Sequence, residues 1–211
     1  MTSAALIAPI HTLQDIPHMA GLDDSPRGRV LRAAAYLFRQ QGFARATVRE
    51  LAQIVGIQSG SLFHHFKTKD DILAAVMEEA IRYNLKRMQA AVNDHQQPID
   101  QLRGLIRAEL ESINGDTGAA MAVLVFEWDA LNAERQVPLL ALRDQYEQLW
   151  LDVLAQAQAQ GLISQPPFIW RRLIGGAISW TVTWYKATGP VSLDQLTDMV
   201  LRMGLDGTVI K

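Results

Sequence analysis

The sequence predicts an all-α protein of about nine helices, three of which are short and lie near the N-terminus. Apolar residues recur at intervals of three and four along most of the chain, which is the period of a helix that buries one face. Alternation of apolar and polar residues, the sign of a strand, extends over no useful length. Helix start and stop signals separate the apolar segments, so each helix can be placed along the chain.

The three short helices are expected between residues 29 and 66. The first spans residues 29–41. The second begins after Thr47, because Glu50 three residues later completes a capping box. Gly56 ends the second helix, since glycine tolerates the left-handed backbone of a sharp turn. A third helix follows from Ser59 to Phe66.

Six longer helices are expected in the remainder of the chain. They cover residues 69–92, 97–113, 119–131, 138–160, 167–187 and 192–204. The segment 119–131 is apolar nearly all round, so we expect it at the centre of its domain. Pro138 is expected at the first position of its helix, where its missing N–H costs nothing. Ser192 and Gln195 form a second capping box.

Bulk composition limits the class of protein. With 49% hydrophobic residues, the 211-residue chain can bury a substantial core. It contains no cysteine, which excludes disulfides and thiolate metal sites. No apolar run is long enough to cross a bilayer. We therefore expect a cytoplasmic protein without a membrane partner.

Charge is distributed unevenly along the chain. Between Pro26 and Lys69 there are eight basic residues and one acidic residue, Glu50, a net charge of +7. The whole chain nevertheless carries −2, so the remainder is acidic. A basic segment joined to an acidic body indicates a polyanionic partner for that segment alone.

The basic segment also has the spacing of a helix-turn-helix. Residues 47–55 supply a first helix, and Gly56 supplies the turn. The positions expected to face the core are Leu51, Ala52, Val55, Leu62 and Phe66. Ser61, His64 and His65 then face outward, as the residues of a recognition helix must in order to reach base edges.

The stretch from Arg29 to Leu73 resembles the DNA-binding domain of the TetR family of transcriptional regulators. The matching elements are Phe38, Gly42, Phe43, Thr47, Leu51, Ala52, Gly56, the segment 60–66 and Lys69. The resemblance implies a repressor that binds a palindromic operator in double-stranded DNA as a homodimer and is released by a small-molecule effector. It divides the chain into a flexible arm (1–24), a helix-turn-helix domain (25–71) and an effector-binding and dimerisation domain (72–211).

Carried over by position, the resemblance and the flanking charges define an expected DNA-binding set. It consists of Arg45, Thr47, Arg49, Gln58, Ser59, Gly60, Ser61, Phe63, His64, His65, Lys67 and Lys69. Two positions depart from the family pattern: Phe63 replaces the usual Tyr, which removes a hydroxyl, and Lys67 replaces a common Pro, which adds a charge.

Each of these residues also has a simpler interpretation. Thr47 caps its helix whether or not it meets a phosphate, and Lys69 could be solvated. His65 could be a structural hydrogen-bonding residue instead of a DNA contact. A metal site at His64 and His65 is disfavoured, because adjacent helical residues point about 100° apart and no third ligand lies nearby.

The resemblance implies that the last two helices pair in the homodimer as a four-helix bundle. Their apolar faces are Leu173, Ile174, Ala177 and Ile178, and Leu196, Met199, Val200 and Met203. Gly175 and Gly176 would let another helix approach closely. Arg171 and Arg172 are assigned to solvent or an interface, with an acidic ligand as the alternative.

An effector pocket is expected among aromatic residues of the C-terminal domain. The candidates are Phe126, Trp128, Trp150, Trp180 and Trp184. For Trp180 and Trp184, packing in the core or in the dimer is the alternative. The segment 180–190 is similar to TetR-type regulators of lipid or steroid breakdown that sense acyl-CoA thioesters, whereas a hydrophobic drug is the other effector class considered.

Catalytic motifs are absent. The sequence has no P-loop, dinucleotide-binding turn, nucleophile elbow or His-Glu metal pattern, so we expect no enzyme activity, no cofactor and no metal ion. A helical enzyme with scattered catalytic acids is one alternative. The competing functional class is a ligand-independent DNA-binding adaptor or interaction protein on the same fold. An apolar cavity would favour the sensor, and a filled core with an exposed apolar patch the adaptor.

Overall fold

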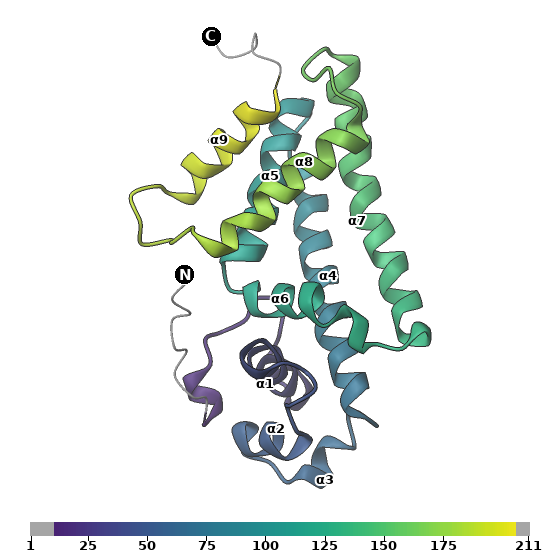
Figure 1. The fold of residues 1–211 in the computed structure, drawn as a ribbon, viewed down its shortest axis with the longest axis vertical. Helices are drawn as coiled ribbons and strands as arrows, with labels where there is room; N and C mark the ends of the chain where they lie inside the picture. The colour runs from purple at the N-terminus through teal and green to yellow at the C-terminus, as the bar shows by residue number, and fades with distance from the viewer. Residues whose placement is uncertain (1–10, 206–211) are drawn as a thin grey trace. The chain divides into compact units, whose positions relative to one another are not determined.

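The computed structural model describes residues 11–205 and confirms the all-α fold class (Figure 1). Over these residues it has nine α-helices, three 3-10 helices and no strand. The α-helices are α1 (Pro26–Gln41), α2 (Val48–Val55), α3 (Ser59–Leu62), α4 (Lys69–Asn93), α5 (Pro98–Asn114), α6 (Gly118–Phe126), α7 (Ala133–Ala159), α8 (Pro167–Trp180) and α9 (Leu193–Gly204). The 3-10 helices are η1 (Leu13–Asp15), η2 (Trp128–Ala130) and η3 (Thr181–Thr183). None of the helices found in residues 11–205 combines the length and the apolar character that a membrane span requires.

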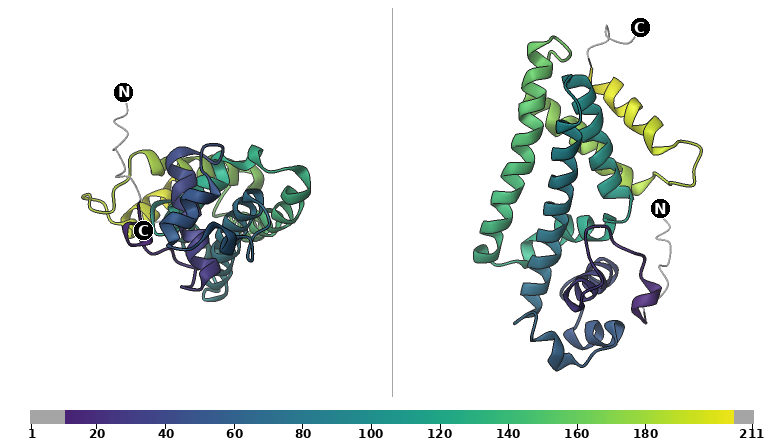
Figure 2. Two further views of the ribbon diagram at one scale, coloured as in Figure 1. Left: turned by 90° about the horizontal axis from the view of Figure 1, so that it is seen from below. Right: turned by 180° about the vertical axis from the view of Figure 1, so that it is seen from behind.

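The described residues form two compact units. The first comprises residues 11–80 and 119–137, and the second comprises residues 81–118 and 138–205. Helices α4 and α7 each contribute several residues to both units, and α6 has only its first residue, Gly118, in the second unit. The two units are therefore connected by continuous helical backbone, which can also be followed from behind (Figure 2).

In the first unit, α1 begins three residues earlier than expected. Ser25 is its N-cap, and the Ser25 Oγ accepts a hydrogen bond of 3.0 Å from the backbone N–H of Gly28. Pro26 occupies the first helical position, where a backbone N–H would have no hydrogen-bond partner within the helix. The expected apolar face is buried, with Val30, Ala34, Leu37 and Phe38 all in the core.

Residues 11–24 differ from the expected flexible arm. They contain η1, and the side chains of Ile16 and Met19 are buried. These two buried apolar side chains hold the backbone of the segment in place. The segment has no helical period, so the sequence pattern did not predict their burial. The part of the expected arm before residue 11 lies outside the described residues.

The predicted helix 119–131 is interrupted, and its C-terminal part is not central. The α-helix ends at Phe126 and is followed by η2. Ala119, Ala120 and Val123 are buried, whereas Phe126 is 76% exposed. Continuous apolar sequence therefore predicted burial wrongly here, because only one side of this short helix meets other described side chains.

Pro138 does not open its helix. Helix α7 begins at Ala133, and the Asn132 Oδ1 caps it by accepting a 3.0 Å hydrogen bond from the N–H of Arg135. Pro138 thus lies inside α7, where its ring nitrogen can donate no backbone hydrogen bond. The side-chain cap at Asn132, which lies outside the expected range, decides the true start.

Helix α8 ends at Trp180, earlier than the expected residue 187. The buried hydroxyl of Thr181 donates to the carbonyl oxygen of Ile178 at 2.6 Å and accepts from the Asn114 Nδ2 at 2.8 Å. These bonds accompany the change to the tighter turn η3, which the pattern of tryptophans did not indicate. The capping box of Ser192 and Gln195 at the start of α9 is confirmed.

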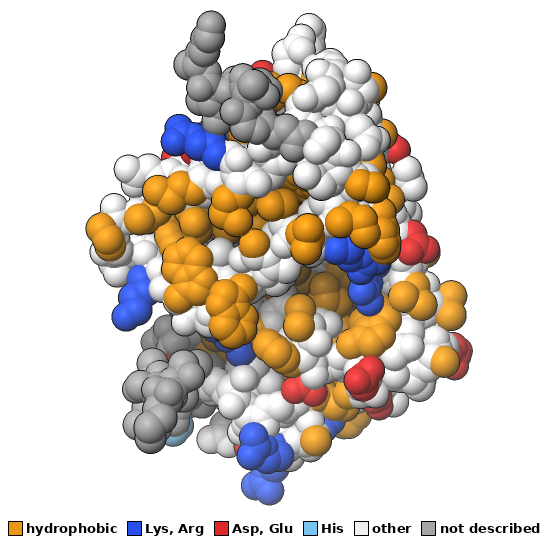
Figure 3. Space-filling view, turned by 45° about the horizontal axis from the view of Figure 1, so that its top comes forward, with side chains coloured by type: hydrophobic (Ala, Val, Ile, Leu, Met, Phe, Trp, Pro, Cys, Tyr) orange, Lys and Arg blue, Asp and Glu red, His pale blue; other side chains and the backbone are white. Residues whose placement is uncertain are grey.

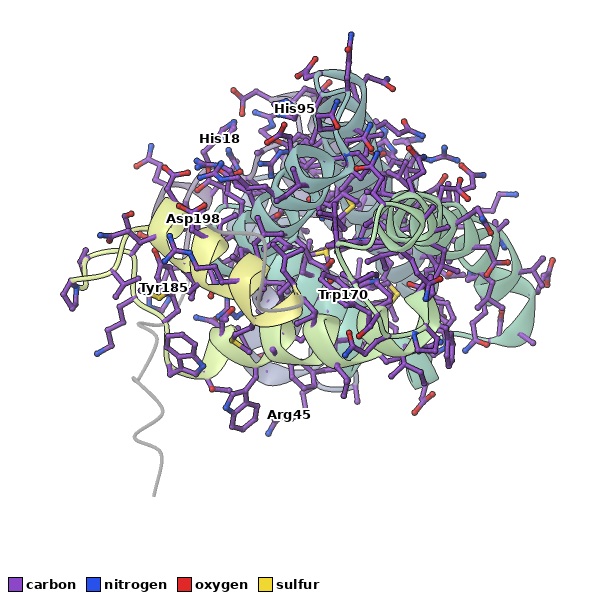
Figure 4. All side chains as sticks on the ribbon, turned by 90° about the horizontal axis from the view of Figure 1, so that it is seen from above. His18, Arg45, His95, Trp170, Tyr185 and Asp198 are labelled. Atoms are coloured by element: carbon purple, nitrogen blue, oxygen red, sulfur yellow. The ribbon has the colours of Figure 1, made fainter. Side chains whose placement is uncertain are left out.

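The core of the second unit forms where α5 packs against both α8 and α9. Trp150 and Trp170 are buried at its centre, with ring centroids 6.2 Å apart. The Trp170 Nε1 donates a 2.6 Å hydrogen bond to the carbonyl oxygen of Gly204 at the end of α9. On α9, Asp198 accepts a 2.7 Å hydrogen bond from the Nε of Arg103 on α5; Figure 4 labels Trp170 and Asp198.

The apolar residues of α8 and α9 divide into two sets. One set is buried in the unit's own core: Ile174, Ile178, Leu196 and Val200. The other set is exposed: Phe168, Ile169, Leu173, Trp180, Val182 (in η3), Trp184 (just after η3), Met199 and Met203. We call the exposed set the apolar face; hydrophobic side chains gather on the side of the molecule drawn in Figure 3. The faces that the helical period predicts for α8 and α9 contain residues of both sets, because periodicity does not distinguish the chain's own core from an exposed interface.

Gly204 is required by the packing of Trp170. A Cβ at Gly204 would overlap the indole ring of Trp170, whereas a Cβ at Gly176 would meet nothing within 4 Å. We expect Gly204→Ala to lower the free energy of unfolding by about 1–3 kcal/mol through overpacking. Gly176→Ala should be neutral or stabilising by up to about 1 kcal/mol, because alanine favours helix. Urea denaturation measures both, and equal stability of the two variants would contradict the packing role.

Candidate nucleic-acid interface

The helix-turn-helix forms from α2, a turn at Gly56 and α3. Gly56 has a φ of 75°, a left-handed conformation that disfavours other residues. The N–H of Ile57 bonds the carbonyl oxygen of Ala52 at 3.0 Å, which closes the C-terminus of α2. The core positions expected for this motif are all buried: Leu51, Ala52, Val55, Leu62 and Phe66.

The expected recognition helix is shorter than its predicted span. Regular α-helix ends at Leu62, and the next three residues continue in tight turns. In these turns a backbone N–H bonds the carbonyl oxygen three residues earlier, as the N–H of His65 bonds the carbonyl oxygen of Leu62 at 3.0 Å. Gly60 is the second residue of α3 and lowers the helical propensity of this segment.

The outward side of this segment carries the residues that were expected to meet DNA. Gln58, Gly60, Ser61, Phe63, His64, His65 and Lys67 are exposed, and Ser59 is half-buried. A Cβ at Gly60 would meet nothing within 4 Å, so the backbone there is open to an incoming partner. The fold thus collects these polar and basic groups within ten residues on one accessible segment.

Thr47 is a cap in the structure. Its Oγ1 accepts from the N–H of Glu50 at 3.1 Å, and the Glu50 Oε2 accepts from the Thr47 N–H and hydroxyl, both at 2.8 Å. The hydrogen bond from the Thr47 hydroxyl, followed by that from its N–H, lowers the pKa of the Glu50 carboxyl. The contact of Thr47 with a phosphate stays a prediction, and its exposed position is compatible with one.

The ammonium group of Lys69 is hydrogen-bonded within the protein. Its Nζ donates to the carbonyl oxygens of Phe43 at 2.8 Å and Ala46 at 2.9 Å, and lies 4.2 Å from the centroid of the Phe43 ring. The lysine therefore joins the first residue of α4 to the connector between α1 and α2. A phosphate contact of Lys69 remains a prediction, and it would compete with these carbonyl groups.

The two flanking arginines differ in their surroundings. The Arg45 Nε donates to the carbonyl oxygen of Gln41 at 2.6 Å, which satisfies a free carbonyl at the end of α1. Arg49, on α2, is exposed. A third arginine, Arg27, pairs with Glu79 at 2.7 Å and stacks 5.7 Å from the centroid of the Phe66 ring. Arg27 thus makes a structural contact between α1, α4 and the end of the helix-turn-helix.

The start of α4 is also tied to the start of α7. The Asp71 carboxylate caps α4 by accepting from the Thr68 N–H at 2.9 Å, and its other oxygen accepts from the Nη2 of Arg135 at 2.6 Å. Burial raises the pKa of Asp71, but the hydrogen bonds from Arg135 and Thr68 outweigh it and lower the pKa overall. The segment that follows the recognition helix is thereby connected to α7.

The five aromatic residues expected in an effector pocket are divided between the two units. Phe126 and Trp128 belong to the first unit, and the other three to the second. Within the second unit Trp150 is fully buried, whereas Trp180 is 66% exposed and Trp184 is also exposed. The exposed positions of Trp180 and Trp184 fit an interface better than a pocket wall.

Sequence reasoning missed a polar cluster inside the second unit. Glu109 on α5 is buried and meets Arg171 of α8, which also contacts Glu147 of α7. The signal was present, because Glu109 continues the helical spacing of the buried Leu102, Leu105 and Ile106. Gly175 leaves space for this guanidinium, since a Cβ there would overlap Arg171. Helix approach, the expected use of Gly175, is thus not its role within this unit.

Family models match both parts of the chain. The model of bacterial regulatory proteins of the tetR family matches residues 30–76. The model of the tetracyclin repressor-like C-terminal domain matches residues 95–208, more than half of the chain. The two matched segments thus contain the helix-turn-helix and most of the second unit.

Similar proteins include transcriptional repressors. The HTH-type transcriptional repressor KstR2 of Mycobacterium tuberculosis is 29% identical over 90% of this chain and 96% of its own length. KstR2 of Mycolicibacterium smegmatis is 30% identical over 87% of this chain and 90% of its own length. The solved M. tuberculosis structure, described as a ketosteroid transcriptional regulator, has a TM-score of 0.78, with 89% of this chain and 98% of that one covered.

A solved structure described as the superantigen pfit is also similar to this chain. The two are 51% identical, with 89% of this chain and 94% of that one covered, and the TM-score is 0.79. This fold therefore occurs in chains that are described in quite different terms.

The contacts of Lys69 predict a structural effect of its removal. Lys69→Met should lower the free energy of unfolding by about 1–2 kcal/mol, because carbonyl oxygens of the connector lose a charged donor. Lys67→Met is the matched control, since Lys67 is exposed and should change stability by less than about 0.5 kcal/mol. Thermal and urea unfolding measure both. If the two variants unfold alike, the tie between α4 and the connector does not stabilise the unit.

Proposed function

This chain belongs to the TetR family of bacterial regulatory proteins, and from that membership we propose that it binds a palindromic operator as a homodimer and releases it when a small molecule binds. It is a ligand-responsive, DNA-binding transcriptional regulator, as its repressor relatives indicate. We assign DNA binding to residues 25–71, and effector binding and dimerisation to residues 72–211. The exposed segment from Gln58 to Lys67 is the observation that carries the proposal.

DNA recognition follows from the side chains of that segment. Ser61, His64 and His65 are exposed donors and acceptors at the end of a short helix, which suits base edges in the major groove. Exposed Arg49 and Lys67 lie on either side in sequence and would neutralise phosphates. Phe63 is 53% exposed and offers apolar contact where the family usually has a tyrosine hydroxyl.

Dimerisation would cover the apolar face. Its eight large apolar side chains come from α8, η3, the residue after η3, and α9, the last helices of the second unit. Leaving so many exposed is unfavourable in water, and contiguous patches of this kind mark interaction sites. A second copy would supply an equally apolar surface, as an isologous two-fold interface requires.

Release of DNA would depend on the two helices shared by both units. An effector bound in the second unit favours one arrangement of α4, and this changes the separation of the two recognition helices in the dimer. The Asp71–Arg135 pair joins the starts of α4 and α7, so both helices would respond together. Effector and operator then weaken each other's binding by the same factor.

The effector class is proposed from the relatives and the sequence. KstR2 is described as a ketosteroid transcriptional regulator, which supports a hydrophobic or amphipathic organic effector for this chain. An acyl-CoA is the more specific proposal, since residues 180–190 are similar to regulators that sense such thioesters. A hydrophobic drug is the alternative.

An interaction protein on the same fold is the competing proposal. The apolar face and the likeness to a chain described as a superantigen favour it, because a protein partner could cover that face. The two proposals differ on the ligand: the adaptor binds DNA without needing an effector, whereas the regulator releases its operator when an effector binds. An interaction protein without sequence-specific DNA binding would not need the exposed polar segment from Gln58 to Lys67.

DNA binding tests the proposal directly. Fluorescence anisotropy with fragments from beside its own gene should show saturable binding that falls steeply with salt, as phosphate contacts require. His64→Ala should weaken binding about tenfold, which corresponds to the loss of one base contact. His95→Ala is the matched control, because His95 is exposed in the second unit and should leave affinity unchanged. Weak binding without sequence preference, equal in both variants, would favour the interaction protein.

The oligomeric state tests the role of the apolar face. Leu173→Glu places a charge on the face and should shift a dimer to monomer in sedimentation velocity at micromolar concentration. Leu140→Glu is the control, since Leu140 is an exposed leucine of α7 outside that face. A wild-type monomer, or a Leu173→Glu dimer, would contradict the proposed interface.

A further inference from the structure

Five polar or amphipathic side chains meet inside the second unit. Glu109 comes from α5, Tyr146, Glu147 and Trp150 come from α7, and Arg171 comes from α8. The guanidinium donates from Nη2 to the Glu109 Oε1 at 3.3 Å and from Nε to the Glu147 Oε2 at 3.2 Å. It also lies 4.6 Å from the centroid of the Trp150 ring and 6.0 Å from that of Tyr146. We call these five residues the polar cluster.

Charge is not balanced in the polar cluster. Two carboxyl groups share one guanidinium, so full ionisation leaves one negative charge in excess. Burial is the main cause that raises the pKa of Glu109, against the opposing attraction of Arg171. Burial and the neighbouring Glu109 raise the pKa of Tyr146 well above its ordinary value, so Tyr146 stays neutral.

Hydrogen bonding is incomplete as well. The Glu109 Oε2, the Glu147 Oε1 and the Trp150 Nε1 are buried and make no hydrogen bond of proper geometry with protein groups. Glu109 is 6% exposed and Trp150 is fully buried. Each such orphan costs about 1–3 kcal/mol unless a partner satisfies it. The Trp150 N–H and the Tyr146 hydroxyl lie close enough to the Glu109 carboxyl to shift pKa values in the cluster, and a group that both donates and accepts would satisfy the remaining oxygens and the indole N–H together.

We propose that the polar cluster binds the hydroxyl group of an otherwise apolar effector. This deepens the proposed function, on which it rests, by naming the chemistry of the bound group. An alcohol donates its O–H to a carboxylate oxygen and accepts from the indole N–H, which an ether, a carboxylate or a phosphate cannot do together. The apolar body would replace contacts of the surrounding core, which is built of leucine, isoleucine and valine. In an acyl-CoA effector, the acyl part and not the phosphates would lie here.

A matched series of probes with a straight alkyl chain tests the site. Isothermal titration calorimetry compares 1-decanol, decyl methyl ether and decanoate on the full chain. The alcohol should bind at least about tenfold more tightly than the ether, since a hydrogen bond to a charged acceptor is lost in the ether. Decanoate should bind more weakly than the alcohol, because its carboxylate has no O–H to donate to the carboxyl oxygens of the cluster.

Variants assign the effect to the cluster. Glu109→Gln removes the charge but keeps an amide oxygen that accepts, so it should reduce the preference for alcohol over ether. Glu111→Gln, on the same helix and paired with Arg87, should retain the full preference. Trp150→Phe keeps an aromatic ring, removes the N–H and should weaken alcohol binding about fivefold, so it serves if Glu109→Gln does not fold. Circular dichroism establishes that each variant is folded.

Several results would overturn the site. Equal binding of alcohol and ether, or binding of neither, would mean that ordered water alone satisfies the cluster. Preference for decanoate would mean an anion site. Operator binding without ligand is measured on the same samples. Operator binding without alcohol preference rejects the site alone, whereas alcohol preference without operator binding rejects the regulator and keeps the site.

Discussion

The hydrogen bonds from Lys69 to the connector between α1 and α2 hold the helix-turn-helix to the helix that leaves it. Lys69 is the first residue of α4, and the carbonyl oxygens of Phe43 and Ala46 lie just before the capping box of α2. The ammonium group thus satisfies backbone acceptors in a segment without regular structure. The position of α3 depends on it, because α3 is placed between α2 and α4 along the chain.

The beginnings of α2 and α4 use the same chemistry. In each, a threonine and an acidic residue three positions later exchange hydrogen bonds: Thr47 with Glu50, and Thr68 with Asp71. Asp71 differs because its second oxygen also binds Arg135. A local cap thereby also becomes a contact with α7, and the Glu50 cap of α2 similarly accepts a 3.4 Å hydrogen bond from the Gln41 Nε2 of α1.

The second unit combines two features that disfavour an isolated, ligand-free monomer. Large apolar side chains remain exposed on α8 and α9, and a polar cluster with unsatisfied atoms lies buried between α5, α7 and α8. Each feature costs free energy in the chain alone. Each cost would be offset by a partner of matching chemistry: an apolar surface for the first and a hydroxyl group for the second.

The sequence alone determined the helical fold, the helix-turn-helix and both predicted capping boxes. Those features depend on local rules, namely the helical period, glycine turns and side chains that bond a backbone N–H three residues away. The prediction differed from the structure where a contact with a residue distant in sequence determined the end of a helix or the burial of a side chain. Thr181 ends α8 with a bond from Asn114, and Ile16 and Met19 are buried in a segment without helical period.

Only the tertiary structure decided which side chains face each other. Periodicity placed Leu173, Ile174, Met199 and Val200 on apolar faces, but it could not say which would be buried in the chain's own core. It also could not place Glu109 beside Arg171, 62 residues away, or Lys69 beside the carbonyl groups of residues 43–46. Side-chain burial and charge pairing depend on how helices pack, and the information for that packing is spread over the whole chain.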